Sequence, residues 1–199
     1  MALFEEQDFR GRALVAVPKD SPLGGPGGLP LDAGGIAQAL GPVAALGGVL
    51  VPGGNVAGGV LASAILAPLA GLRAGENVRF ERADANNQIS DFYDLTYPQT
   101  GFHRWSAEDI MTSFVVVGEP RTVVHFFNAP DADSREGSFQ VTVGNDRLVR
   151  CRSLRGQQPQ SLPSEPPEAV TITMAPDFWK WTENVKTFEN ELSSLRFGG

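Results

Sequence analysis

The sequence predicts an α+β protein with a mainly antiparallel β domain, an extended Gly/Ala-rich N-terminal arm and a C-terminal amphipathic helix. Three observations lead to this prediction. The forty residues 33–72 carry no charged side chain. Of the aromatic residues (12 Phe, 3 Trp and 2 Tyr), only Phe4 and Phe9 precede position 80. Apolar residues recur at alternating spacings of three and four over the last turns of the chain, which is typical of an amphipathic helix.

Composition bounds the class of protein. A chain of 199 residues with 42% hydrophobic and 20% charged residues is globular and long enough for one good core. The formal net charge of −7 argues against a whole-surface affinity for nucleic acid. A single cysteine, Cys151, excludes an intrachain disulfide and fits a reducing compartment. The acidic start lacks an apolar stretch, so we expect cytoplasmic synthesis without a cleaved signal peptide.

The chain divides by composition into four parts. Aromatic side chains supply large buried areas, so we expect the main core to begin at about residue 80. Four prolines and the absence of apolar periodicity at 156–169 indicate a semi-extended linker. The parts are an N-terminal arm at 1–75 with its uncharged segment at 33–72, a β-rich core domain at 76–155, a Pro-rich linker at 156–169, and a strand plus helix at 170–199.

Dense Val and Phe runs and alternating patterns predict the strands of the β domain. Two hairpins stand out, one turning at 118–121 and the other at 144–146. Their sequences favour antiparallel pairing, because the turns are short. The expected strands are 78–82, 114–117, 122–127, 139–143, 147–152 and 170–174.

The uncharged segment has three interpretations. It contains ten Gly, ten Ala and fourteen Leu, Val or Ile residues, so it must be buried against protein or lipid. A membrane span would use 56–72, and a reversibly inserting, membrane-associated protein would use 43–72. Burial against protein is favoured, because small residues let backbones approach closely. The interface residues expected from its second half are Val56, Val60, Leu61, Ile65 and Leu69.

The last part of the chain shows an a/d pattern over three heptads. Two interpretations remain open for the helix that this pattern predicts. It docks onto a β domain, its own or a neighbour's, or it associates with copies of itself. The residues of the stripe, which we expect at an interface, are Phe178, Trp181, Val185, Phe188, Leu192 and Leu195.

The sequence contains none of the common catalytic, metal-binding or nucleotide-binding motifs. The two histidines are His103, in an aromatic loop near aspartates, and His125, inside an apolar strand. Catalysis by His103 or Cys151 stays an alternative, and a structural role is favoured for both. We expect no cofactor, no metal and no small-molecule substrate.

Four arginines cluster in the second hairpin, and two of them share one strand face. Guanidinium groups bind carboxylates and phosphates in pairs of hydrogen bonds. Because the chain is acidic overall, acidic patches on neighbouring subunits are favoured over nucleic acid as their partner. The residues are Arg147, Arg150, Arg152 and Arg155.

Together these observations predict a structural, non-enzymatic subunit of a large assembly. The arm and the helix would contact copies of this chain or other subunits. Capsid, cement or tail components of virions and phage particles use arms in this way, which is an analogy of architecture. A membrane-associated protein using 43–72 and an enzyme using His103 or Cys151 are the alternatives.

Overall fold

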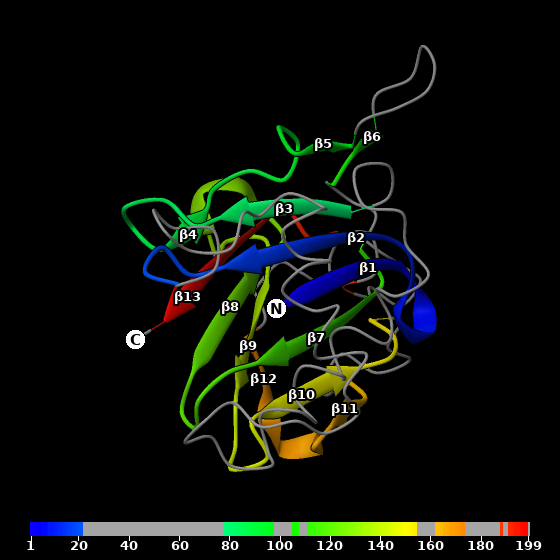
Figure 1. Ribbon diagram of the computed structural model, residues 1–199, viewed down its shortest axis with the longest axis vertical. Helices are drawn as coiled ribbons and strands as arrows, with labels where there is room; N and C mark the ends of the chain where they lie inside the picture. Colours follow the sequence, from blue (N-terminus) through cyan, green and yellow to red (C-terminus); the bar gives the residue numbers. More distant parts are fainter. Residues whose placement is uncertain are drawn as a thin grey trace, which may run out of the picture.

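The computed structural model describes residues 1–21, 78–97, 105–107, 111–154, 162–173, 188 and 191–198. These residues form a mainly β structure of two sheets that lie one over the other (Figure 1), with a separate two-stranded pair. The described part of the chain contains no α-helix, so the predicted α+β class is wrong for it. The prediction of a mainly antiparallel β domain is confirmed.

Sheet A has six strands in the order β11-β10-β7-β1-β2-β3. All neighbours pair antiparallel except β2 and β3, which run parallel with Ala13 opposite Val78 and Val17 opposite Arg82. The strands are β1 (Ala2–Glu6), β2 (Arg10–Val17), β3 (Val78–Arg82), β7 (Ser113–Val117), β10 (Leu148–Cys151) and β11 (Ser164–Glu165).

Sheet B has five antiparallel strands in the order β12-β9-β8-β13-β4. The strands are β4 (Gln88–Ile89), β8 (Val123–Phe127), β9 (Ser138–Thr142), β12 (Val170–Thr173) and β13 (Ser194–Gly198). A further antiparallel pair joins β5 (Thr96–Tyr97) to β6 (Trp105–Ser106). The strands expected between 78 and 174 are thereby found, β3 with the expected bounds and the others with ends shifted by one residue.

The N-terminal residues do not form an extension outside the core. Strands β1 and β2 lie in the interior of sheet A, between β7 and β3. Leu3, Phe4 and Leu14 are completely buried. The prediction that the core begins at about residue 80 is therefore wrong for residues 1–17. Aromatic counting missed these strands because their inward side chains are mainly aliphatic.

The predicted C-terminal helix is also wrong where the structure describes it. Residues Ser194–Gly198 form β13, which is hydrogen-bonded between β8 and β4. Leu195 and Phe197 are buried while Arg196 between them is exposed, which is the alternation of a strand. Leu195 fits a heptad with Leu192 and a strand alternation with Phe197, and pairing on both sides decides for the strand. The rest of the expected helix lies outside the described residues, except Phe188.

A stack of phenylalanine rings joins the two sheets. Phe114 of sheet A faces Phe126 and Phe139 of sheet B, with ring centroids 5.4 and 5.7 Å apart. Phe126 and Phe139 are 4.6 Å apart, and Phe188 meets Phe139 edge-on at 4.9 Å. Burying such rings supplies much of the hydrophobic stabilisation of a small core. The stack therefore fixes how the sheets pack.

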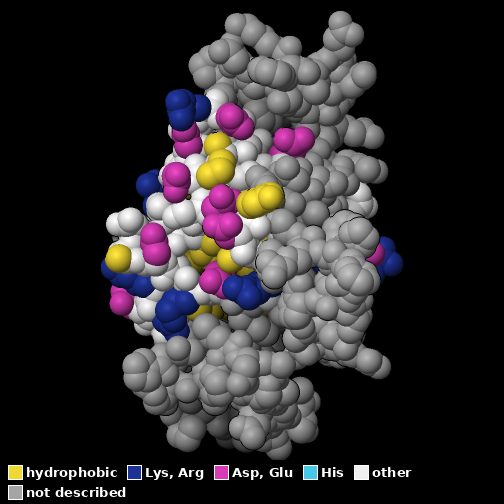
Figure 2. Space-filling view, turned by 90° about the horizontal axis from the view of Figure 1, so that it is seen from above, with side chains coloured by type: hydrophobic (Ala, Val, Ile, Leu, Met, Phe, Trp, Pro, Cys, Tyr) yellow, Lys and Arg dark blue, Asp and Glu magenta, His cyan; other side chains and the backbone are white. Residues whose placement is uncertain are grey.

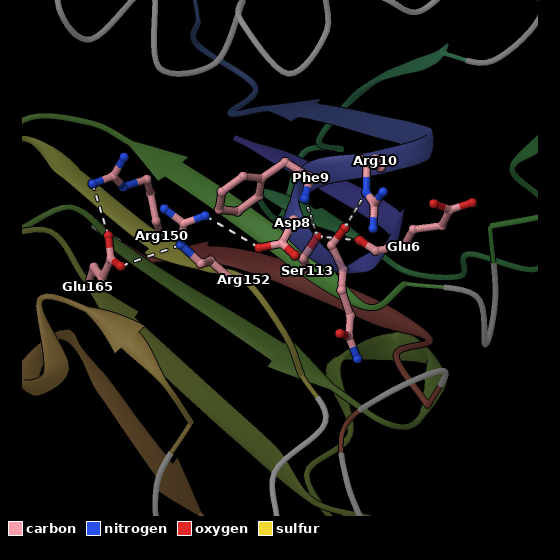
Figure 3. Close-up of polar contacts among 9 residues, drawn as sticks. Glu6, Asp8, Phe9, Arg10, Ser113, Arg150, Arg152 and Glu165 are labelled. Carbon is pink, nitrogen blue, oxygen red and sulfur yellow. Dashed lines mark hydrogen bonds and ion pairs between the residues drawn. The ribbon is translucent and has the colours of Figure 1, made fainter.

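A tight corner (Gln7–Phe9) connects β1 to β2. Asp8 and Phe9 have φ of 56° and 61°, a conformation that side-chain-bearing residues seldom adopt. The hydroxyl of Ser113 holds the corner from β7 (Figure 3): it accepts a hydrogen bond from the Phe9 amide at 3.2 Å and donates one to the Glu6 carbonyl at 2.6 Å. Ser113 is completely buried, so these bonds replace those of water.

A second corner (Pro130–Ala132) follows β8 with the same geometry. Asp131 and Ala132 have φ of 57° and 56°. The hydroxyl of Ser194 accepts from the Ala132 amide at 3.1 Å and donates to the Ala129 carbonyl at 2.6 Å. The backbone hydrogen bonds of the two corners also correspond. The Asp8 amide donates to the Arg152 carbonyl at 2.9 Å, and the Asp131 amide donates to the Ser90 carbonyl at 2.7 Å.

The two corners show that the fold is an internal repeat. In each half a hairpin folds at its corner, and a later strand of the same half pairs in the opposite sheet. Strand β4 of the first half pairs in sheet B, and β10 of the second half pairs in sheet A. Each half therefore completes the other's sheet, and we expect the two to fold as one unit.

Replacing Ser113 or Ser194 by Ala should lower the free energy of unfolding by about 1–3 kcal/mol each, because a buried amide and a buried carbonyl lose their partner. Urea unfolding at constant pH measures the loss. The exposed Ser134 provides the control, and S134A should leave stability unchanged. Equal stability of all three variants would show that the hydroxyls do not hold the corners.

The amino group of Met1 lies inside the structure. It is buried, donates to the Ala16 carbonyl at 2.9 Å, and the Met1 carbonyl accepts from the Ala16 amide at 3.0 Å. Burial lowers the pKa of this amino group from its ordinary 8.0 to about 6. The folded chain therefore favours the uncharged amine.

The stability of the 199-residue chain should rise with pH between about 6 and 8, because only the unfolded chain binds the Met1 proton there. A difference of two pKa units corresponds to roughly 3 kcal/mol in the free energy of unfolding. Urea unfolding at pH 5.5, 7 and 8.5 measures it. The same chain with an acetylated amino group should lose this part of the pH dependence, whereas identical profiles for both chains would contradict the assignment to Met1.

Candidate interaction surfaces

Each sheet ends in two edge strands, and three of these four edges are protected against pairing with another chain. Strand β4 has only two residues, and its turn is closed by the side chain of Asp84. Strand β11 also has two residues and is followed directly by Pro166 and Pro167, which offer no amide hydrogen. Strand β3 carries charge, including an Arg79–Glu81 ion pair at 3.1 Å. Shortness, proline and charge are the usual protections of sheet edges.

Strand β12 has none of these protections. Its sequence Val170-Thr171-Ile172-Thr173 is uncharged, free of proline and β-branched throughout. One side of the strand pairs with β9, where Thr171 lies opposite Gln140. Val170 and Ile172 pack against the core, and Thr171 and Thr173 are exposed. Among the described strands, β12 is therefore the edge best suited to pair with another strand.

The two arginines that share a strand face form a row of ion pairs on the edge of sheet A (Figure 3). Glu165 lies between them, 2.9 Å from Arg150 and 3.5 Å from Arg152. Arg152 also contacts Asp8 at 3.3 Å and covers the ring of Phe9 at 5.8 Å. These side chains are 40–54% exposed, so each pair contributes only about 0–1 kcal/mol.

Arg147 pairs with Glu119 at 3.1 Å, and Arg155 lies outside the described residues. The arginines that are described thus bind carboxylates of their own chain. Contact with an acidic partner or phosphate stays a prediction. Acidic and basic side chains are interspersed on the described part of the face seen in Figure 2.

Of the two histidines, only His125 is described. It lies on β8, stacks on Phe127 at 6.3 Å between ring centroids, and pairs in register with Arg196. Partial burial lowers the pKa of its imidazole, and the Arg196 cation lowers it further. Within the described ranges no three His, Cys, Asp or Glu side chains come together as a metal site would require.

Cys151 faces the core from β10 and is completely buried. Its thiol donates to the Ser153 carbonyl at 3.1 Å. Burial raises the pKa of the thiol to about 12, despite the arginines that flank it in sequence. Sequence proximity misleads here, because Arg150 and Arg152 lie on the other face of the sheet.

The interface residues expected from the heptad are only partly described. Phe188, Leu192 and Leu195 are buried in the core of this chain. The other members of both predicted sets lie outside the described residues; they are Val56, Val60, Leu61, Ile65, Leu69, Phe178, Trp181 and Val185. No described helix is long and apolar enough to cross a membrane.

Ser113, Ser194 and the β12 edge were not among the residues singled out from the sequence. A signal for the corners does exist, since Phe4 and Asp8 recur as Phe127 and Asp131 at the same separation. No sequence signal identifies an edge strand, because strand order depends on pairing between distant segments.

Comparison with known proteins gives no relative. No family model, no curated protein and no solved structure matches the chain. The proposals below rest on the geometry alone.

The Cys151 thiol should not react with a disulfide reagent in the folded protein at pH 8, because a pKa of about 12 leaves almost no thiolate. Adding guanidinium chloride should release the full signal within the mixing time. The reaction is followed by absorbance, with free cysteine as the reference. Rapid modification of the folded chain would contradict the burial of this thiol.

Proposed function

We propose that the protein is a structural, non-enzymatic subunit that associates with copies of itself through β12. The unprotected β12 edge supports this proposal most directly. Unpaired amide and carbonyl groups along such an edge bind an added strand through main-chain hydrogen bonds. Self-association through this edge is the assembly role that we infer for the chain.

An antiparallel twofold pairing suits the composition of β12. With the axis through Ile172, each copy places Ile172 opposite Ile172 of the second copy and Thr171 opposite Thr173, so that paired side chains lie on the same side of the sheet. Such pairs of β-branched residues are favourable across strands. The chain carries a net charge of −7, so copies repel each other, and an uncharged edge permits the closest approach.

The pairing joins sheet B of one copy to sheet B of the next. A strand of four residues buries less area than a stable interface needs. We therefore expect association that strengthens with concentration and with the number of copies in an assembly. Thr171 and Thr173 are exposed, so substitutions at these positions change the edge without opening the core.

Thr171→Lys should shift the protein toward the monomer, because it places like charges on both sides of the pairing axis. Light scattering on a size-exclusion column, run over a range of concentrations, measures the average mass. Asn145→Lys adds the same charge in the exposed turn between β9 and β10 and serves as the matched control.

The control should keep the mass of the unchanged chain. A wild-type chain that is monomeric at every concentration would overturn the proposal. So would association that T171K leaves unchanged while its urea unfolding remains normal.

A further inference from the structure

The parallel pairing of β2 with β3 restricts the path of the chain between them. β2 ends at Val17, and β3 begins at Val78, which lies opposite Ala13 near the other end of β2. The connection must therefore return along the length of the strands, as a crossover over a face of the sheet does. The inner face of sheet A is packed on sheet B. The outer face is the one that remains for the crossover.

The centre of the outer face of sheet A is apolar and buried, whereas Arg150 and Arg152 lie on the same face toward the β11 edge. The central side chains of this face form a cluster separate from the core between the sheets, and they are completely buried: Ala2, Phe4, Ala13 and Val115. Half-buried apolar side chains surround them, namely Phe9, Val15, Val117 and Leu148. Among the described side chains, Phe9 packs on this cluster, 5.8 Å from Phe4 between ring centroids. Phe9 covers one end of a face that spans four strands.

The outer face of sheet B differs at equivalent positions. A row in register across it places polar or charged side chains on five neighbouring strands: Thr171, Gln140, His125, Arg196 and Gln88. None of these side chains is fully buried, and Thr171 and Arg196 are exposed. Sheet B therefore meets water on its outer side, whereas sheet A requires an apolar cover there.

We propose that the uncharged segment 33–72 of the same chain covers the outer face of sheet A as an intramolecular strap. It belongs to the connection that must cross this face. It supplies fourteen Leu, Val or Ile residues and no charge that would have to leave water. Its ten Gly and ten Ala residues let its backbone lie close to the sheet.

Tethering explains why the chain's own segment binds this face in preference to another molecule. Both ends of the connection are fixed in sheet A. The Lys19 amide donates to the Asn87 side chain at 3.0 Å, and Arg82 donates to the Ser21 carbonyl at 3.1 Å. A segment held at both ends has a high effective concentration at the face between them. This inference does not depend on β12, which belongs to the other sheet.

Photo-cross-linking tests the strap in the full-length chain. Val15 and Leu148, on different strands of the outer face, are replaced one at a time by p-benzoylphenylalanine. No Lys or Arg lies between Lys19 and Arg73, so trypsin releases the whole segment as one peptide, Asp20–Arg73. After irradiation and digestion, mass spectrometry should find the peptide that carries the photoreactive residue joined to Asp20–Arg73. Gln140, on the outer face of sheet B, is the matched control position and should give no such product.

Refolding a mixture of light and ¹⁵N-labelled chains separates the strap from other covers. Cross-links within one isotopic species support it. Cross-links that combine the two species show that the segment covers a second copy, and they overturn the proposal. Irradiation with liposomes of neutral and anionic lipids is the last arm, in which transfer of the cross-link to lipid overturns it as well. So does the absence of the Asp20–Arg73 product at both positions.

Discussion

Two buried serine hydroxyls hold the turns on which the rest of the structure depends. Ser113 and Ser194 each bind an amide and a carbonyl of a corner whose residues have positive φ. Without these partners the corners would leave polar backbone groups unpaired in a buried position. The fixed corners turn each hairpin, and a later strand of the same half pairs in the opposite sheet. The phenylalanine stack can then close between two sheets that share strands from both halves.

The repeat makes the backbone nearly symmetric, but the side chains make the two outer faces different. One row across sheet A contains Val15, Ala2 and Val115, whereas the corresponding row across sheet B contains Gln140, His125 and Arg196. The hydrogen bonds at the two corners are of the same kind, and the strands of both sheets pair antiparallel except for the parallel pairing of β2 with β3. The difference therefore lies in what each face contacts. A polar face needs only water, and an apolar face needs protein or lipid.

Much of the β domain could be predicted from the sequence, because its signals are local. Alternation and short turns give the strands between 78 and 174, including Val78–Arg82 with its observed bounds. The C-terminal strand was mistaken for a helix because Leu195 fits a heptad with Leu192 as well as a strand alternation with Phe197. Its strand state is determined by pairing with β8 and β4, which lie far away in sequence. Periodicity alone does not contain this information.

The interaction surfaces were less predictable for the same reason. The Ser113 contacts join residues 104 and 107 positions apart, and Arg152 finds Asp8 over a separation of 144. Arg147, Arg150 and Arg152 looked available in the sequence, and in the fold they meet carboxylates of the same chain. Cys151 looked activated by its neighbours, and it faces the opposite side of the sheet. In each case the face of the strand decides, and the neighbours in sequence do not.

The long connection between β2 and β3 follows the same physical logic. Lengthening a loop costs little, since each doubling of its length adds only about 0.6 kcal/mol of closure entropy. Burying one large apolar side chain returns about 1.5–3 kcal/mol. A few contacts with the apolar face of sheet A thus outweigh the extra loop length, although ordering the segment consumes part of the gain. In the sequence the uncharged stretch resembles an arm that reaches onto neighbours. We infer instead that it covers sheet A, because the connection to which it belongs begins after β2 and ends at β3 of that sheet.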